Sequence, residues 1–139
     1  MVINQYGEYS ENIENKYLYF RTKGNHSGLL YTSSSIDLTN YSKICIELDS
    51  ENRSWYNIKG CPGMHLGTEI PTVNDSSGET LNTTHSINFI ESTSSFNAGS
   101  FELDINDISG NYYPSITVSG TVRFDPYDGY LSIKNWWLE

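Results

Sequence analysis

The sequence is poor in positive charge and in long apolar runs. Only 8 of its 139 residues are lysine or arginine, against 17 aspartates and glutamates, so the net charge is −9 at pH 7. No basic stripe is available to neutralise phosphates, which disfavours nucleic-acid binding, and an anionic membrane surface would repel the chain. No run approaches the roughly 18 apolar residues of a membrane span, so we expect no membrane insertion. The first five residues, MVINQ, lack a charged n-region and an apolar h-region and therefore predict no secretion signal.

Cysteine is also scarce, and the two thiols match no metal-binding spacing. Cys45 lies in the apolar segment 44–48, and Cys61 precedes Pro62 in a turn. A structural zinc site needs four ligands at characteristic spacings, and nothing marks the chain as having passed through an oxidising compartment. We therefore predict that both cysteines are unpaired.

Sequence motifs of known catalytic sites are missing. The chain has no G-x-S-x-G nucleophile elbow, no glycine-rich phosphate loop and no H-x-E motif with paired cysteines. His26, His65 and His85 are far apart in sequence, and we expect them to be solvated loop residues rather than ligands. A glycosidase pair is defined by the separation of two carboxylates in space, which a sequence does not give. The prediction is a protein without enzymatic activity and without a cofactor.

Three carboxylates near expected strand ends are candidate calcium ligands: Asp125, Asp128 and Glu139. Calcium takes roughly six to eight oxygen ligands. The D-x-x-D spacing of the two aspartates is equally expected from turn chemistry, because aspartate favours the start of a turn. No metal site is assigned on this pattern alone.

Aromatic and small polar residues, by contrast, are abundant. The chain has 11 tyrosines, 5 phenylalanines and 3 tryptophans, and 44 residues are serine, threonine or asparagine. This composition is typical of β-rich proteins rather than disordered ones. Short segments with period-2 alternation, separated by turn residues, predict strands at 17–22, 29–33, 43–49, 55–59, 64–68, 85–91, 101–105, 112–118, 121–124 and 130–138, with hairpins expected between 55–59 and 64–68 and between 112–118 and 121–124. The expected fold is all-β: an antiparallel jelly-roll β-sandwich of about nine or ten short strands, which hides its sheet edges.

The expected organisation is one β-sandwich domain over residues 1–139, with 1–16 as a candidate loosely ordered N-terminal segment. A short helix is predicted at Tyr9–Asn15 and a long polar loop at 69–84. The alternating apolar positions predict the buried core, which comprises Ile44, Ile46, Leu48, Phe101, Leu103, Ile105, Ile116, Val118 and Ile133.

Strand alternation also places two groups of aromatic residues. Tyr17 and Tyr19 alternate with Leu18 and Phe20, so the two pairs point to opposite faces of the strand. One pair is expected to face outward or toward a second sheet. Trp136 and Trp137 are adjacent and must point to opposite faces unless a bulge intervenes.

Three stretches of the sequence carry a resemblance to a known group of domains. They are Ile36–Ile44 (IDLTNYSKI), Phe101–Tyr113 (FELDINDISGNYY) and Ile133–Glu139 (IKNWWLE). Together they resemble β-sandwich appendage domains in tail and baseplate proteins of phages and prophages of Firmicutes. Those domains are jelly-roll modules like carbohydrate-binding modules, and they occur where tail fibres meet the host surface. The resemblance implies a place in the virion tail, contacts with other tail or baseplate subunits, and recognition of host cell-surface polysaccharide. The loop at 69–84 and the doubled tryptophan depart from the pattern.

The candidate ligand-binding residues are Arg53, Trp55, Tyr56 and Asn57. Sugar rings stack on exposed aromatic faces, and neighbouring arginine and asparagine side chains hydrogen-bond the sugar hydroxyls. These four residues offer that combination within a short segment. The alternative is that Trp55 or Tyr56 covers the core or packs against another subunit.

The function predicted from the sequence is a non-enzymatic tail or baseplate appendage that recognises host cell-surface glycan. A single shallow site should bind weakly, so avidity from many copies favours a homo-oligomer. Two alternatives stay open: a purely structural or oligomerisation module of a virion fibre, and a carbohydrate-binding module cut from a larger bacterial enzyme. A glycan array separates the first reading from the second, and the neighbouring genes separate it from the third.

Overall fold

The computed structural model describes residues 2–3, 7–12, 17–24, 26–49, 51–54, 61–75, 79–89, 94–96, 99–120 and 128–139. These residues contain no helix and form fifteen strands. Several strands are only two or three residues long, which explains why the structure divides the chain more finely than the nine or ten strands expected from alternation. Accordingly, this part of the chain includes no helix that could cross a lipid bilayer.

Six strands form the first antiparallel sheet. Along it lie β1 (Val2–Ile3), β4 (Ser27–Tyr31), β14 (Asn111–Ser119), β8 (Gly63–Gly67) and β11 (His85–Asn88), with β5 (Ile36–Asp37) beside the start of β14. The strands predicted over 112–118 and 64–68 are confirmed, and the structure pairs them with each other, a contact that the sequence did not predict. Their hairpin partners predicted at 121–124 and 55–59 lie outside the described residues.

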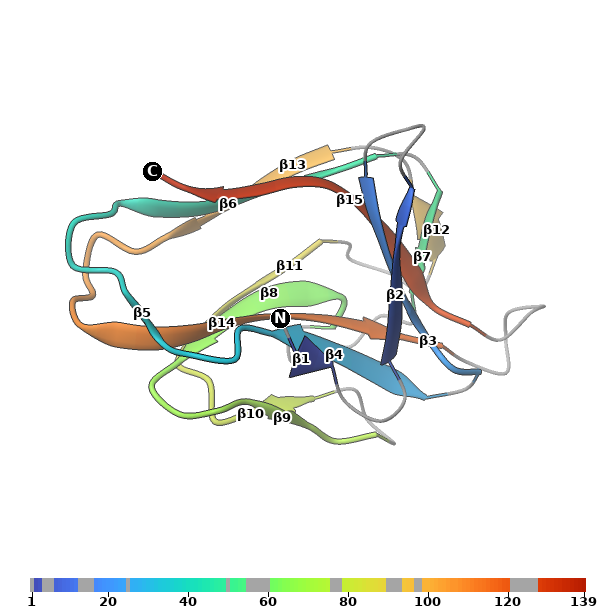
Figure 1. The fold of residues 1–139 in the computed structure, drawn as a ribbon, viewed down its shortest axis with the longest axis horizontal. Coiled ribbons are helices and arrows are strands. Elements are labelled where there is room, and N and C mark those ends of the chain that lie inside the picture. Colours follow the sequence, from blue (N-terminus) through green and yellow to red (C-terminus); the bar gives the residue numbers. More distant parts are fainter. Residues whose placement is uncertain are drawn as a thin grey trace.

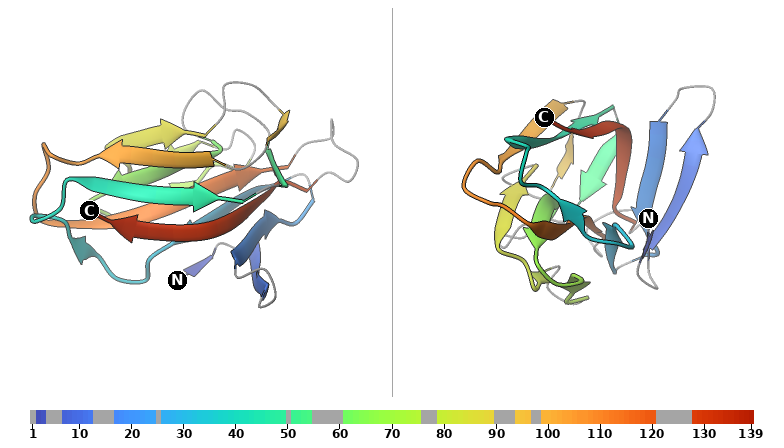
Figure 2. Two further views of the ribbon diagram at one scale, coloured as in Figure 1. Left: turned by 90° about the horizontal axis from the view of Figure 1, so that it is seen from above. Right: turned by 60° about the vertical axis from the view of Figure 1, so that its left-hand side comes forward.

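Seven strands form the second antiparallel sheet. Its path runs through β12 (Ser94–Phe96), β7 (Asn52–Ser54), β15 (Tyr130–Leu138), β3 (Tyr17–Thr22) and β2 (Gly7–Asn12). The second half of β15 also pairs with β6 (Lys43–Leu48), which in turn pairs with β13 (Gly99–Asp104). The two sheets lie face to face, as in a β-sandwich (Figure 1; Figure 2).

A β-bulge divides β15 into two parts. Ile133 is opposite Leu48 and Asn135 is opposite Glu47, so Lys134 is an extra residue in the ladder. A bulge bends a strand and increases its local twist. In Figure 1, β15 runs along β6 and β13 and then turns down beside β2 and β3 at one end of the molecule. This bend gives the sheet two differently oriented outer surfaces.

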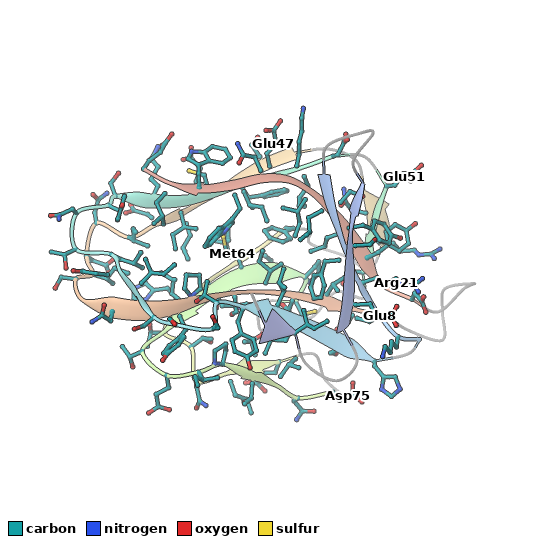
Figure 3. The ribbon with its side chains drawn as sticks, viewed as in Figure 1. Glu8, Arg21, Glu47, Glu51, Met64 and Asp75 are labelled. Atoms are coloured by element: carbon teal, nitrogen blue, oxygen red, sulfur yellow. The ribbon has the colours of Figure 1, made fainter. Side chains whose placement is uncertain are left out.

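The core lies between the two sheets and largely follows the predicted alternation. Eight of the nine predicted core residues are buried: Ile44, Ile46, Leu48, Leu103, Ile105, Ile116, Val118 and Ile133. The ninth, Phe101, is half-buried and packs against Phe89 with ring centroids 4.8 Å apart. Figure 3 shows Met64 between the layers, where it is fully buried.

The two adjacent tryptophans point to opposite faces, and the bulge determines which one faces inward. Continued alternation from Ile133 would direct Trp137 into the core. Because Lys134 is inserted, Trp136 packs against the core instead, while Trp137 lies opposite Cys45 and its indole N–H donates to Glu139 at 3.3 Å.

Two local predictions were wrong. The helix expected at Tyr9–Asn15 is a strand over the described part, because β2 pairs with β3 along residues 7–12. The segment 69–84, expected to be a polar loop, contains a small hairpin of β9 (Thr72–Val73) and β10 (Thr80–Leu81). In both cases pairing with another strand overrides a weak local signal.

Polar side chains, some buried and some partly exposed, connect this hairpin segment to the first sheet by hydrogen bonds. The Asp75 carboxylate accepts from the Ser27 backbone N–H at 2.9 Å and contacts His26 Nδ1 at 2.8 Å. The Ser27 hydroxyl is 2.8 Å from the Ser119 hydroxyl, which lies 3.0 Å from the Cys61 thiol. Loop residues thus become part of the packed structure through hydrogen bonds rather than apolar contacts.

Both cysteines are free and buried, as predicted. Burial raises the pKa of the Cys61 thiol. Burial also raises the pKa of Cys45, and the nearby carboxylates of Glu139 and Glu102 add to this effect. Both thiols are therefore protonated and unreactive at neutral pH.

Candidate functional site

One of the four sequence-predicted binding residues lies in the described structure. Arg53 is in β7, whereas Trp55, Tyr56 and Asn57 lie outside the described residues. Tyr130, at the start of β15, is directly opposite Arg53 in the ladder. The guanidinium carbon of Arg53 lies 5.0 Å from the centre of the Tyr130 ring, a cation–π arrangement.

The register of four strands places a row of side chains across the outer face of the second sheet. Glu8 on β2 is opposite Arg21 on β3, Arg21 is opposite Tyr130 on β15, and Tyr130 is opposite Arg53 on β7. The adjacent residues in β3 and β15, Phe20 and Leu131, are fully buried. Because neighbouring residues of a strand point to opposite faces, the row faces away from the core.

We call this surface the platform: Glu8, Ser10, Tyr19, Arg21, Arg53 and Tyr130. Its aromatic part is a stacked pair, Tyr19 and Tyr130, with ring centroids 5.5 Å apart and planes inclined by 28°. Both rings are half-buried, so part of each remains accessible. Burial, followed by the proximity of Tyr130, raises the pKa of Tyr19 to about 12. Tyr19 therefore keeps its hydroxyl proton and serves as a neutral hydrogen-bonding group.

The charged part of the platform is a compact ion-pair network. Arg21 donates from Nε and Nη2 to the same Glu8 oxygen, at 3.0 Å and 2.8 Å. Its Nη1 lies 3.6 Å from an Asp128 oxygen, and Lys23 Nζ lies 3.6 Å from the other Glu8 oxygen. The bond from Arg21 lowers the pKa of Glu8, and the same bond raises the pKa of Arg21. Both groups are therefore charged at neutral pH.

An open pocket of about 240 Å³ lies over this part of the sheet. It is lined by Glu8, Ser10, Tyr19 and Arg21, and Figure 3 shows Glu8 and Arg21 at the end of the molecule where β2 and β3 lie. The pocket combines an aromatic face, two hydroxyls, a carboxylate and a guanidinium. That set can contact the C–H face of a sugar ring and hydrogen-bond its hydroxyls.

Backbone contacts hold the start of β15 in place beside β3. Thr22 N donates to Gly129 O at 2.9 Å, and Gly129 N donates back to Thr22 Oγ1 at 3.1 Å. Asp128 accepts from the Gly24 backbone N–H at 2.7 Å. These bonds fix the position of Tyr130 relative to Tyr19, so the stacked pair is preorganised.

The histidines do not belong to the platform, and one prediction about them was wrong. His65 is not a solvated loop residue, because it is fully buried in β8. Its ring nitrogens lie 2.7 Å from Ser86 Oγ and 3.0 Å from Thr117 Oγ1. His26 contacts Asp75, and His85 lies 3.4 Å from an Asp107 oxygen. The three rings occupy separate hydrogen-bonded settings.

Of the three carboxylates considered as calcium ligands, the two that the structure describes, Asp128 and Glu139, lie at opposite ends of β15. Asp125 lies outside the described residues. Asp128 precedes β15 and Glu139 follows it, so nine strand residues, or about 30 Å, separate them. The Asp128 carboxylate instead accepts a hydrogen bond from the Gly24 backbone N–H and forms an ion pair with Arg21, which agrees with its interpretation as a turn residue.

A second group of potential ligand atoms lies at the far end of the same sheet. Cys45 Sγ and one carboxylate oxygen each of Glu102 and Glu139 lie within 4.8 Å of one another. Strand register accounts for this group, because Cys45 is opposite Glu102 on one side and Trp137 on the other. Lys43 neutralises part of the charge through an ion pair with Glu102 at 3.2 Å.

Sequence reasoning missed Glu8, Ser10, Arg21 and Tyr130 as site residues, and it considered the facing of Tyr19 without assigning it to a site. Alternation in 17–22 correctly separated Tyr19 from Leu18 and Phe20, but it did not show which strands lie beside β3. The platform combines the consecutive strands β2 and β3 with β15 and β7, which are distant from them and from each other in sequence, and only strand pairing brings these residues together. Comparison with models of protein families and with curated proteins gives no match, so the interpretation of the site depends on its own geometry.

Proposed function

We propose that this chain is a non-enzymatic carbohydrate-binding module with a jelly-roll sandwich fold. The observation that carries the proposal is the stacked Tyr19–Tyr130 pair, flanked by the Glu8–Arg21 ion pair over an open pocket. Half-buried tyrosine rings on the outer face supply apolar contact at low entropic cost, and the surrounding charged groups satisfy sugar hydroxyls. A shallow surface of this kind suits weak recognition of an extended polymer.

The biological setting that we propose is the tail or baseplate of a phage or prophage, with host cell-surface polysaccharide as the ligand. The support is the sequence resemblance carried by Ile36–Ile44, Phe101–Tyr113 and Ile133–Glu139. In that setting the chain is a homo-oligomer, because several weak sites held together raise the overall affinity without any new contact. Sedimentation analysis tests the oligomer, and tail and holin genes beside this gene, rather than hydrolase genes, are the expected neighbourhood.

The test is retention of the protein by purified cell-wall polysaccharides, measured together with its melting temperature. Replacing Tyr130 by Ala should abolish retention and leave a folded protein, because the ring lies on the outer face of the sheet. Trp137→Ala is the matched control, since it removes an aromatic ring from the other half of the same outer face and should retain the polysaccharide.

A second pair of variants separates this site from the one predicted by sequence. If the Trp55→Ala, Tyr56→Ala double variant loses retention while Tyr130→Ala keeps it, the binding site is the 53–57 segment and not the platform. If the wild-type protein binds no polysaccharide, the carbohydrate-binding proposal is wrong and the structural-module alternative is favoured.

A further inference from the structure

The charges around the platform cancel among the described residues. Three cations, Arg21, Lys23 and Arg53, are accompanied by three carboxylates: Glu8 and Asp128 in direct ion pairs, and Glu51 as a negative charge close enough to act on Tyr19. An acidic ligand would approach Arg21 only by competing with two carboxylates that already contact it. The net charge of −9 on the whole chain adds a general repulsion of polyanions.

An uncharged polyhydroxyl ligand does not meet this difficulty. A hydroxyl both donates and accepts, so neighbouring hydroxyls of one sugar can donate to Glu8 and accept from Arg21 without breaking the ion pair. Hydrogen bonds to charged groups are stronger than those between neutral groups. The paired charges thus favour a neutral sugar over a charged one.

The direction of the platform indicates how such a ligand lies. Glu8, Arg21, Tyr130 and Arg53 are consecutive in the cross-strand register. Four strands at the usual spacing of about 4.8 Å give this row a length of about 14 Å, perpendicular to the strands. That length exceeds one sugar ring and matches a short stretch of polymer.

From these observations we infer that the platform binds an uncharged oligosaccharide that lies across strands β2, β3, β15 and β7, with vicinal hydroxyls on the Glu8–Arg21 pair. The inference rests on the carbohydrate-binding role proposed above and specifies its ligand class and orientation. Tyr130 is the central stacking position, and Arg53 marks the distal end of the bound segment.

The test begins with an array of neutral hexasaccharides, acidic oligosaccharides (polyuronates and sialic-acid polymers) and wall teichoic acid. The affinity of the best ligand is then measured by calorimetry at low and high sodium chloride. A neutral hexasaccharide whose affinity does not change with salt is expected, because no counterions are released when it binds. Selection of an acidic probe, or a steep loss of affinity with salt, would overturn the inference while leaving the carbohydrate-binding function intact.

Two variants test the orientation. Glu8→Gln should lower the affinity for the neutral hexasaccharide about tenfold, which is the loss expected when one hydrogen bond to a charged group is removed. Glu47→Gln is the matched control, because Glu47 pairs with Lys134 at 3.5 Å on the other half of the sheet and should bind normally. Arg53→Gln should lower the affinity for the hexasaccharide but leave the affinity for the corresponding disaccharide unchanged.

Equal losses in Glu8→Gln and Glu47→Gln would contradict the assigned site. An unchanged affinity of Arg53→Gln for the hexasaccharide would contradict the orientation across the strands. If the wild-type protein binds none of the probes, the proposed function fails and the inference fails with it, an outcome distinct from binding with the wrong charge preference.

Discussion

At the scale of single residues, the platform depends on groups whose ionisation the fold controls. Tyr19 sits between a second tyrosine ring and a layer of charged side chains, and its pKa is raised to about 12. The pKa of Glu8 is lowered, mainly because Arg21 donates a hydrogen bond to its carboxylate. The aromatic surface therefore stays neutral, and the ion pair stays charged, over the whole physiological pH range.

The first prediction concerns Tyr19 in alkaline solution. The folded protein should ionise this tyrosine at about pH 12, above the ordinary value of 10. Since the unfolded chain loses the proton first, the contribution of Tyr19 to stability is complete below pH 10 and is lost as the pH rises from 10 to about 12. Ultraviolet difference titration of the wild type against Tyr19→Phe measures this, and a Tyr19 phenolate near pH 10 would contradict it.

The second prediction concerns Glu8 in acid. Its pKa should lie below the ordinary value of 4.5 because Arg21 donates to its carboxylate. The contribution of the pair to stability is present above pH 4.5 and is lost as the pH falls through the lowered pKa. Carboxyl NMR titration measures the pKa. In Arg21→Gln it should move back toward 4.5, and no movement would show that Arg21 is not the cause.

At the scale of secondary-structure elements, the sequence predicted the strands with apolar alternation, but it did not predict β2 or which strands are neighbours. The alternation of Ile44, Ile46 and Leu48 correctly predicted β6 and its buried face. The residues of β2, GEYSEN, carry no such apolar alternation, so its local signal suggested a helix. β2 is a strand because β3 offers it a hydrogen-bonding edge, which is a property of the assembled sheet.

The same limit explains what was missed at the candidate site. Arg53 was chosen for its neighbours in sequence, whereas its described aromatic partner, Tyr130, is 77 residues away (130 − 53) and adjacent only through pairing of β7 with β15. Likewise, His65 lies in a segment with little charge around it, but its burial depends on hydroxyls of Ser86 and Thr117 in other strands. Contacts between distant strands cannot be read from a local pattern.

The third prediction concerns the approach of β14 to the start of β15. A Cβ atom on Gly129 would overlap the carbonyl oxygen of Ser119, which belongs to the backbone and cannot rotate away as a side chain can. Gly129→Ala should therefore cost about 1–3 kcal/mol of stability and displace Tyr130, weakening glycan retention. Denaturant unfolding measures the first effect and polysaccharide retention the second.

Gly99→Ala is the control for this prediction. Among the described residues its Cβ would contact the Phe101 ring at 3.2 Å, and that ring is a side chain that can adjust. Gly99 also lies in β13, away from the platform. An equal or larger loss of stability in Gly99→Ala than in Gly129→Ala would show that the Gly129 contact does not limit the packing.

At the scale of the whole molecule, two sheets enclose one apolar core, and a set of buried hydroxyls joins the first sheet to the segment 69–84. The chain of contacts from Cys61 through Ser119 and Ser27 to Asp75 lies at the border between these parts. Reactivity of the thiols therefore reports on the integrity of the assembled fold rather than on local exposure.

The fourth prediction uses this property. In native buffer without reductant, an alkylating reagent should modify Cys61 only as fast as the protein unfolds, because the thiol is fully buried and its pKa is raised. After denaturation, mass spectrometry should show two alkylated cysteines. A denatured protein two hydrogens lighter and resistant to alkylation would indicate a disulfide, and fast native labelling would indicate an open structure around Cys61.

Lys134, the extra residue of β15, separates two lengths of one strand that can vary independently over evolutionary time. In an uninterrupted strand, inserting or deleting one residue turns every later side chain of that strand to the opposite face of the sheet. In β15 the bulge at Lys134 already absorbs one extra residue. Outward residues before the bulge, such as Tyr130, can therefore be substituted while Trp136 and Leu138 after the bulge still pack against the core. The outward-facing residues of β2, β3, β15 and β7 can then be substituted while the backbone and the core of the sandwich stay the same. A lineage of such proteins could acquire new ligand preferences by substitution alone, without altering strand length or fold.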